Sequence, residues 1–422
     1  MKPLEKISWQ SPLDGPWPEI LVNGDLENAE NEWLMSNDIG AYSMSTVALM
    51  HTRRQHGLLV TPLDDPTQRY VVLSHLEMVL ETGARQYKLS THQFPGIAPT
   101  LGYRHLEHFS QDPLPRWVYR FPGGSLERTI CLAPQERGLV IALTWSGKKK
   151  ASLHLRPLMP MRAANSLSFE HGGMKQLVAL RPHDVEMQPV AELPPINFQH
   201  QGVFMGSPDW WRKFEFLDDR GRYPDFQEDL WSPGLFELEL KPKETQYLVV
   251  SVGGALKKAP DDVVMTVAQR QLSFDLSTSA LGAIRSLAVT ADSFVVAERR
   301  AIAAGYPWLE YWSRDELLSI PGLLLCRSRF KLAEEVLRRL IGEFRDGLLP
   351  RRTLSRDEDY QPCVDSSLLL FSIGAQVLAS TDSEEFAQEL FAIERLIFES
   401  IVAGTNGVAR LNHALVEVSG EI

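Results

Sequence analysis

The apolar residues in the first part of the chain form short runs that are typical of β-strands. Gly, Pro or Asp clusters separate these runs from one another. No helical pattern alternates with them, which favours a β-sandwich over a parallel α/β sheet. The predicted strands are Gly57–Val60, Tyr70–Leu73, Trp117–Phe121, Leu139–Leu143, Leu153–Leu155, Leu235–Leu240 and Tyr247–Ser251.

The spacing of the apolar residues changes after Gly253-Gly254 and Pro260. From Asp261 onward they recur every three or four residues, which predicts about five or six helices. One predicted helix buries the face formed by Phe330, Ala333, Val336, Leu337, Leu340, Ile341 and Phe344. Another buries Phe386, Leu390, Ile393 and Ile397.

Three further features complete the helical prediction. Thr381–Glu384 has the Thr-x-x-Glu pattern of a capping box and precedes the helix that contains Phe386. Leu281–Val296 and Asp365–Leu378 are also predicted helices. The second part of the chain is therefore expected to consist mainly of these helices.

Composition narrows the class of ligand and the compartment. The chain has 422 residues and a net charge of −11, so nucleic acid and anionic membranes are poor partners and a neutral polar ligand fits better. The three cysteines, Cys131, Cys326 and Cys363, have the spacing of neither a disulfide framework nor a zinc site. No signal-type segment precedes Ile20, and no apolar run approaches the roughly 20 residues of a membrane span. We expect a cytoplasmic protein without cofactor or metal.

The segment Gly305-Tyr-Pro-Trp-Leu-Glu-Tyr-Trp-Ser-Arg-Asp315 carries the most chemical information. Its aromatic residues precede an Arg-Asp pair on a Gly/Pro-containing loop that opens a helix at Asp315. Sugars are bound by flat aromatic faces together with side chains that make paired hydrogen bonds to hydroxyl groups. The alternative is an aromatic cluster packed under a loop, with Asp315 as an ordinary helix cap.

This segment resembles the Gly-Tyr-Pro-Trp-Phe…Trp-Gly-Arg-Asp signature of the glucosidase domain of prokaryotic-type glycogen debranching enzymes. Ile320–Leu325, Asp346–Pro350 and Val364–Leu368 resemble later motifs of that domain, in the same order. The chain departs from the pattern at Ser313, at Glu316-Leu317 and at Gln361–Cys363. In the first part, similar motifs are Glu32–Asn37 with Gly40, His51–Val60, Asp209–Arg212 and Asp225–Gly234.

The resemblance implies a multidomain β + α fold. A large antiparallel β-sandwich is expected over residues 1–252, a linker helix over 253–277, and an incomplete (α/α)6 toroid over 278–422. It also implies that Arg314 and Asp315 bind a terminal glucose, with Trp308 and Trp312 as stacking or pocket-wall residues. Asp365 is a further substrate-binding candidate, with a helix cap as its alternative.

Other polar residues admit two interpretations. Arg53, Arg54 and His56 precede a strand of the sandwich and are expected to brace the sandwich against the barrel, unless they have a functional role. Glu228 and Asp229 are placed on an irregular acidic loop, which either reaches the cleft or is only solvated. His105 and His108 lack the additional ligands that a metal site needs.

The catalytic residues are not assigned. Hydrolysis of a glycosidic bond needs two carboxyl groups flanking that bond. In the debranching family that the chain resembles, the acid is the Asp of a Trp-Met-Asp motif midway through the barrel. The base is a Glu near the end of the barrel. Neither motif is present, so both are expected beyond Ile422. A twelve-helix barrel also needs at least about 200 residues, more than Thr278–Ile422 supplies.

The expected function is hydrolysis of α-1,6-glucosidic branch points in glycogen or a related α-glucan, with this chain inactive alone. The expected partners are the α-glucan and a second chain that completes the barrel. The alternatives are a non-catalytic α-glucan-binding remnant, half of a split enzyme, or another sandwich-plus-barrel glycosidase of glucoamylase-like or phosphorylase-like type.

Overall fold

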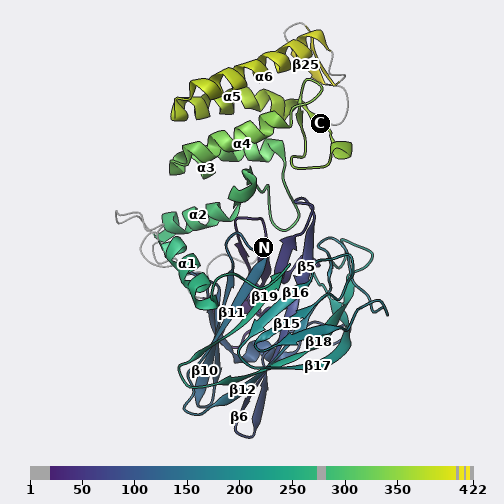
Figure 1. The fold of residues 1–422 in the computed structure, drawn as a ribbon, viewed down its shortest axis with the longest axis vertical. Coiled ribbons are helices and arrows are strands. Elements are labelled where there is room, and N and C mark those ends of the chain that lie inside the picture. The colour runs from purple at the N-terminus through teal and green to yellow at the C-terminus, as the bar shows by residue number, and fades with distance from the viewer. Residues whose placement is uncertain (1–19, 273–281, 405–407, 413–414, 419–422) are drawn as a thin grey trace. The chain divides into compact units, whose positions relative to one another are not determined.

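The computed structural model describes residues 20–272, 282–404, 408–412 and 415–418 (Figure 1). The chain divides into two compact units, Met1–Thr290 and Ala291–Ile422. The segment before Ile20, the expected boundary at 277/278 and the middle of the Gly404–Val408 segment lie outside the described residues.

The first unit is built from antiparallel strands, which form three sheets of five or more strands among the described residues. The largest sheet has nine strands in the order β1-β8-β9-β10-β11-β19-β16-β15-β14, counted over that part of the chain. Its strands are β1 (Ile20–Leu21), β8 (Leu106–Ser110), β9 (Arg116–Phe121), β10 (Gly124–Leu132), β11 (Gly138–Trp145), β19 (Thr245–Val252), β16 (Ile196–His200), β15 (Asp184–Met187) and β14 (Val178–Arg181).

Two further sheets have five described strands each, in the orders β17-β18-β12-β6-β7 and β13-β5-β4-β3-β2. The first contains β17 (Val203–Glu215), β18 (Gln227–Leu240), β12 (Ala151–Leu158), β6 (His75–Thr82) and β7 (Arg85–Lys88). The second contains β13 (Arg162–Ala163), β5 (Arg69–Leu73), β4 (Gly57–Pro62), β3 (Tyr42–Thr46) and β2 (Glu32–Ser36). All seven predicted strand runs lie within these strands.

One hydrophobic cluster connects the three sheets. It contains Leu59 of β4, Leu153 of β12, and the tryptophans Trp33 of β2 and Trp117 of β9, all buried. The two indole rings meet edge to face with centroids 5.0 Å apart. Trp117 also donates its ring N–H to the carbonyl oxygen of Val47 at 2.8 Å, so its polar atom is satisfied inside the core. The sheets are therefore layers around a shared core, as a sandwich requires.

Two helices follow the strands, α1 (Pro260–Leu272) and α2 (Gly282–Ser293). α1 packs on β10 and β11 through the buried Val263 and Val267. The predicted helix over Leu281–Val296 ends early, because Val295–Val296 (β20) pairs with Ala301–Ile302 (β21) instead of continuing the helix.

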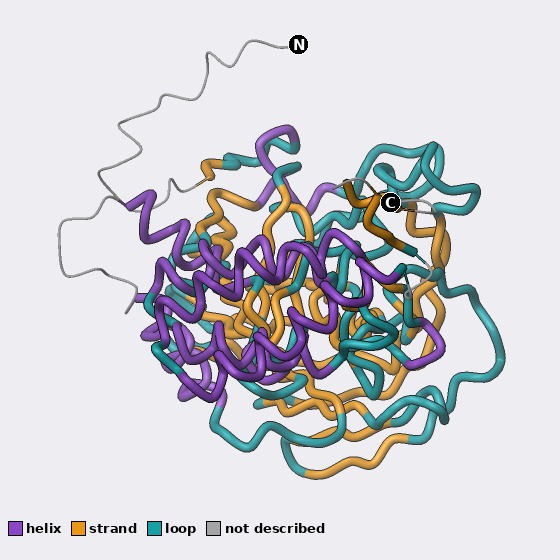
Figure 2. Tube along the Cα trace, turned by 90° about the horizontal axis from the view of Figure 1, so that it is seen from above, coloured by secondary structure: helices purple, strands orange, loops and turns teal. Residues whose placement is uncertain are grey.

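The second unit is built from four longer described helices, α3 (Ser313–Leu323), α4 (Phe330–Gly342), α5 (Val364–Thr381) and α6 (Glu384–Ala403). They lie alongside one another (Figure 2), and α5 contacts each of the other three. On α4 the predicted face is confirmed at its centre, where Ala333, Val336, Leu337 and Leu340 are fully buried. The prediction is wrong at Phe330, the first residue of the helix, which is exposed. The predicted fold class, an antiparallel β-sandwich followed by helices, is confirmed.

Short elements lie between and after the longer strands and helices. The paired strands are β22 (Leu349–Pro350) with β23 (Pro362–Cys363), and β24 (Ala409–Asn412) with β25 (Leu415–Val418). Single 3₁₀ turns cover Glu27–Ala29, Leu101–His105, Ala297–Arg299, Leu325–Arg327 and Asp357–Asp359.

The predicted capping box before α6 is displaced by two residues. Thr381 is the last residue of α5, and Asp382 turns the chain with φ 52°. The cap of α6 is Ser383, whose hydroxyl accepts a hydrogen bond from the amide of Phe386 at 3.3 Å. The third helical position is therefore occupied by an apolar residue instead of Glu, and the reciprocal half of the box does not form.

By length and composition, α5 is the one described helix that would suffice to cross a membrane. Its contacts with α3, α4 and α6 account for its buried residues, among them Leu370, Ile373 and Val377.

Candidate functional site

The aromatic segment of the second unit folds into a turn before it enters α3. The amide of Leu309 donates to the carbonyl of Gly305 at 3.0 Å, and the amide of Ala304 donates to the carbonyl of Glu310 at 2.8 Å. This turn leaves Trp308 43% exposed. A large indole at that exposure offers an apolar surface to a ligand.

The N-terminus of α3 is fixed to two other segments through Ser313. Its amide donates to the carbonyl of Arg351 at 3.2 Å, and the amide of Thr353 donates to the carbonyl of Tyr311 at 3.1 Å. The buried hydroxyl of Ser313 contacts both the carbonyl of Pro350 and, at 2.7 Å, the hydroxyl of Ser366 in α5. The departure from Gly at this position therefore adds a hydrogen-bonded connection between α3 and α5.

Arg314 and Asp365 are brought together by this arrangement. Arg314 Nη1 lies 2.9 Å from Asp365 Oδ2, and each residue lies in the first turn of its helix. The cap of α5 is Cys363, so Asp365 is not the capping residue that the alternative interpretation required.

Asp365 is held in its ionised form. Burial raises its pKa, but hydrogen bonds from the Cys363 thiol, the Ser366 amide and the Arg314 guanidinium outweigh that effect, so the pKa of Asp365 is lowered. The N-terminal end of α5 also favours a negative charge at this position. An anionic Asp365 is suited to orienting Arg314 and unsuited to donating a proton.

Trp312 precedes Arg314 and contacts two cations. The guanidinium carbons of Arg351 and Arg352 lie 5.3 and 5.1 Å from its ring centroid, within the range of a cation–π interaction. Its ring nitrogen is buried and has no hydrogen-bond partner among the described residues. The sequence reasoning missed both arginines, because only the pairing of 311–313 with 351–353 brings them to the ring.

Asp315 lies in the first turn of α3, partly buried, while the helix cap is Trp312. The alternative interpretation of Asp315 as the cap is therefore wrong. Within the part of the chain that the structure describes, its carboxylate forms no hydrogen bond or ion pair with another side chain. Asp315 follows Arg314 directly in sequence, one position further into α3.

Glu316 has a structural role. Its carboxylate is fully buried and binds the Thr353 hydroxyl, the Ile302 amide and the Arg339 guanidinium. Burial raises the pKa of Glu316, and the Arg339 charge opposes that shift. A carboxyl group with all of these partners and no solvent access cannot reach a substrate.

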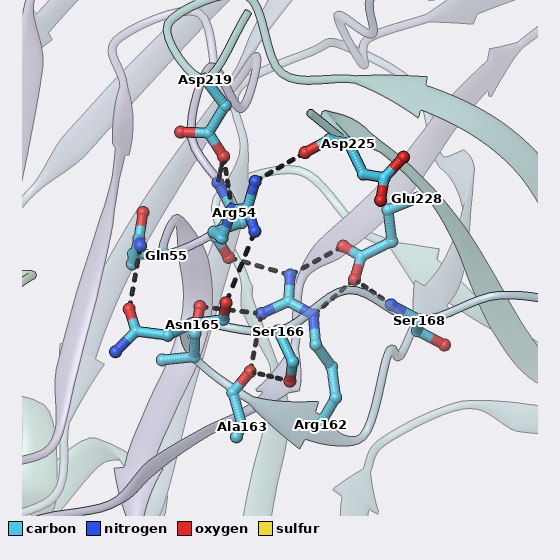
Figure 3. Close-up of polar contacts among 11 residues, drawn as sticks. Arg54, Gln55, Arg162, Ala163, Asn165, Ser166, Ser168, Asp219, Asp225 and Glu228 are labelled. Atoms are coloured by element: carbon cyan, nitrogen blue, oxygen red, sulfur yellow. Dashed lines mark hydrogen bonds and ion pairs between the residues drawn. The ribbon is translucent and has the colours of Figure 1, made fainter. Parts of the chain in front are cut away.

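The prediction that Glu228 and Asp229 lie on a loop of the sandwich is wrong, because both residues lie within β18. Glu228 is fully buried and paired with the side chain of Arg162, and it accepts the Ser168 amide at 2.9 Å (Figure 3). Asp229 accepts the amides of Lys213 and Glu170. Both carboxylates thus bind groups of the sandwich itself.

Arg53, Arg54 and His56 form ion pairs within the first unit. Arg54 binds Asp219 at 2.8 Å (Figure 3), and Glu32 accepts from Arg53 at 2.7 Å and lies 3.0 Å from His56. The hydrogen bond from His56 is the main reason that the pKa of Glu32 falls to about 2.

The two histidines considered as a metal pair have separate surroundings. The ring of His105 packs against Tyr87 and Phe121, each with centroids 5.4 Å apart. His108 lies 3.9 Å from Glu107.

Two family profiles match the chain. The one described as "Glycogen debranching enzyme N terminal" matches residues 31–247, and the one described as "Amylo-alpha-1,6-glucosidase" matches residues 289–421. No curated protein sequence matches the chain.

Several solved structures are similar over part of their length. A bacterial glucoamylase complexed with acarbose has a TM-score of 0.36 and 10% identity, covering 90% of this chain and 59% of that one. A family GH92 alpha-mannosidase from Bacteroides thetaiotaomicron has a TM-score of 0.30 and 9% identity, with coverage of 86% and 51%. This chain thus spans 59% and 51% of their lengths.

The first profile covers the three-sheet sandwich, and the second covers the segment that brings Trp312, Arg314, Asp315 and Asp365 to the ends of α3 and α5. Together they account for most of the chain, which belongs to the glycogen debranching enzyme family.

Proposed function

We propose that this chain carries the glucan-binding part of an amylo-α-1,6-glucosidase that acts on the branch points of glycogen or a related α-glucan. The observation that supports this most is the ion pair between Arg314 and Asp365, at 2.9 Å. Arg314 lies two residues after Trp312 and directly before Asp315, whose carboxylate has no side-chain partner among the described residues. All four residues fall in the range 289–421, which the glucosidase profile matches.

Glucose fits this set of groups. Each of its hydroxyl groups both donates and accepts, so neighbouring hydroxyls bind best to a donor and an acceptor side by side. Arg314 uses one nitrogen for Asp365 and keeps further N–H donors for a ligand, while Asp315 supplies the acceptor. The exposed indole of Trp308 supplies an apolar face for the sugar ring.

We propose further that the chain alone does not hydrolyse the bond. An inverting glycosidase needs one protonated and one ionised carboxyl group roughly 6.5 to 9.5 Å apart. Asp365 has a lowered pKa and binds Arg314, and Glu316 is enclosed by its own partners. Neither meets the requirement for the protonated acid.

A further polypeptide segment is expected to supply the acid and the base and to cover the open side of α6. Phe391, Phe398 and Val402 are 66%, 61% and 46% exposed on this helix. Their spacing of seven and four residues places them on one face, which is an apolar surface of the kind that a protein partner buries. In this proposal the binding half of the pocket belongs to the chain and the catalytic half to the covering segment.

Calorimetric titration of the full chain with a maltooligosaccharide tests the binding proposal. Arg314→Ala and Asp315→Ala should each weaken binding about tenfold, as expected for the loss of a charged hydrogen-bonding group. Arg395→Ala is the matched control, since Arg395 is an exposed arginine paired with Glu399 on α6. Equal affinity of the Arg314, Asp315 and Arg395 variants would contradict the assigned site.

A second assay tests the catalytic part of the proposal. The isolated chain should release no more glucose from a phosphorylase-limit dextrin than a heat-inactivated sample does. Glucose release above that control would show that a carboxyl group of this chain serves as the acid. Binding without release, even after a candidate completing polypeptide is added, would favour the alternative of a non-catalytic α-glucan-binding protein.

A further inference from the structure

The first unit contains a small polar cavity that plays no part in the proposed glucan site. Its polar lining includes His51, His75, His92, Tyr119 and Arg128. The free space is about 10 Å³, enough for one particle of about the size of a water molecule. The remaining wall is apolar, formed by residues such as Leu58, Leu76 and Met78, so the polar groups determine which small species the cavity holds.

Arg128 supplies the strongest charge in this lining. It lies in β10 and is 2% exposed. Its Nη1 donates to the sulfur of Met78 at 3.4 Å, and the guanidinium lies 5.6 Å from the ring of Trp117. Its Nε and Nη2 atoms are buried without any hydrogen-bond partner in the described residues. Both atoms are obligatory donors, because a guanidinium stays protonated in proteins.

No described carboxylate lies within ion-pairing distance of Arg128, whereas two other buried arginines of the first unit, Arg54 and Arg162, are paired with Asp219 and Glu228. A buried cation without a counter-charge is strongly unfavourable. The burial of Arg128 therefore requires a compensating group that the protein does not itself provide.

The remaining titratable groups around the cavity do not provide it. His51 and His75 stack with ring centroids 3.7 Å apart, and burial is the main cause that lowers the pKa of each well below its usual value, so both rings are neutral. The carboxylate of Glu77 is 2.6 Å from His92 Nε2 and is already engaged there. Burial raises the pKa of Tyr119 against the opposing effect of the Arg128 charge and hydrogen bond, so its hydroxyl stays protonated. Tyr119 therefore offers Arg128 a neutral acceptor and no counter-charge.

The lining also offers donors to an anion. His51 Nδ1 is 3.2 Å from the hydroxyl of Ser74, and His51 Nε2 is buried without a partner in the described part of the chain. When the Ser74 hydroxyl donates to Nδ1, the proton of the neutral ring is on Nε2 and becomes a further donor. His92 Nδ1 is likewise buried and unpartnered there.

From these contacts we propose that the cavity binds one monovalent anion of about the size of chloride, held mainly by Arg128. The free volume excludes a large oxyanion, and the positive charge of the lining disfavours a metal cation. A water molecule would fit the space but would leave the charge of Arg128 uncompensated. Because the lining comes from β6, β9, β10 and the loops around His51 and His92, the bound anion would join these segments.

Thermal unfolding of the full chain tests the site, with sodium chloride compared against sodium gluconate at equal ionic strength. An anion that binds only the folded state raises the unfolding midpoint as its concentration increases. We expect that rise with chloride and not with gluconate, which is too large for the cavity. Arg128→Met should abolish the difference, and Arg120→Met, at an exposed arginine paired with Glu107, should retain it.

A second measurement keeps the test decisive if Arg128→Met does not fold. Crystals of the unaltered chain grown with sodium bromide should show an anomalous peak beside Nε and Nη2 of Arg128. Absence of that peak, equal effects of the two salts, or a chloride effect that persists in Arg128→Met would overturn the proposal and assign the cavity to water.

Discussion

The guanidinium of Arg314 and the carboxylate of Asp365 lie 2.9 Å apart across 51 residues of sequence. Each occupies the first turn of a helix, and the two helices, α3 and α5, pack directly against one another. The side chains of Arg314 and Asp365 are 59% and 35% exposed, and ion pairs this exposed add little to stability. The contact is therefore better understood as one that orients a binding group.

The first prediction is that Arg314 and Asp365 are coupled in glucan binding. Asp365→Asn should weaken the binding of maltooligosaccharide, because Arg314 loses the anion that orients it. The same change should have almost no effect in an Arg314→Ala background, which gives a coupling energy of about 1 kcal/mol. Calorimetry on the two single variants and the double variant measures this energy. Additive losses would mean that Asp365 acts on the ligand independently of Arg314.

The second prediction concerns the buried pair Arg162–Glu228, whose side chains are 7% and 0% exposed. Glu228→Gln leaves the Arg162 guanidinium buried without its counter-charge, so the free energy of unfolding of the first unit should fall by about 3–5 kcal/mol. Urea unfolding followed by tryptophan fluorescence measures the loss. Glu239→Gln, which breaks the exposed pair with Lys150, should have little effect. Similar stability of the two variants would be inconsistent with a buried pair.

The third prediction is a loss of stability at acid pH that depends on Glu32. Its pKa in the folded protein is about 2, against 4.5 for the ordinary side chain, mainly because of the hydrogen bond from His56 and then that from Arg53. A lowered pKa contributes stability above about 4.5 that is lost as pH falls toward about 2.

The free energy of unfolding should therefore decline less steeply over this pH range in Glu32→Gln than in the unaltered chain. The glutamine cannot change its charge, so the contribution of this site to the slope disappears. Urea unfolding at several pH values between about 4.5 and about 2 measures both slopes. Identical slopes would show that Glu32 is not the carboxylate that His56 and Arg53 hold.

The fourth prediction is that one of the three cysteines reacts quickly with a thiol reagent. The thiolate is the reactive form, so burial and a raised pKa both slow the reaction. Cys326 is exposed, whereas Cys131 is buried and burial raises its pKa to about 12. Burial also raises the pKa of the half-buried Cys363. Labelling with a disulfide reagent near pH 8 should show one fast thiol, and Cys326→Ser should remove it. A fast phase that survives this change would contradict the described burial.

The local elements of the fold were predictable because their signals are local. The α4 face from Ala333 to Leu340 follows the helical period along a single segment, and the strand runs such as Leu139–Leu143 need no distant partner to be recognised. The aromatic segment with Arg314 was identified in the same way, from consecutive residues and their resemblance to a family motif.

Glu228 shows why other positions could not be predicted. The Ser232-Pro-Gly234 sequence indicates a break, yet β18 continues through it, because the register with β17 shifts between Gly206 and Asp209 and accommodates the proline. The partner of Glu228, Arg162, lies 66 residues earlier. Likewise, Arg351 and Arg352 meet Trp312 only through a pairing of segments about 40 residues apart, for which the sequence carries no local pattern.

The last prediction contrasts two glycines in the helices of the second unit. A Cβ at Gly374 in α5 would meet Leu390 Cδ2 at 2.6 Å, and Leu390 is itself buried in α6. Gly374→Ala should therefore overpack the α5–α6 contact and lower the free energy of unfolding by about 1–2 kcal/mol, net of the better helix propensity of alanine. At Gly322 in α3 no described atom lies within 4 Å of the added Cβ. Gly322→Ala should stabilise by up to about 1 kcal/mol. Urea unfolding monitored by circular dichroism at the helical band compares the two variants, and a stabilising Gly374→Ala would mean that α5 and α6 do not pack as closely as described.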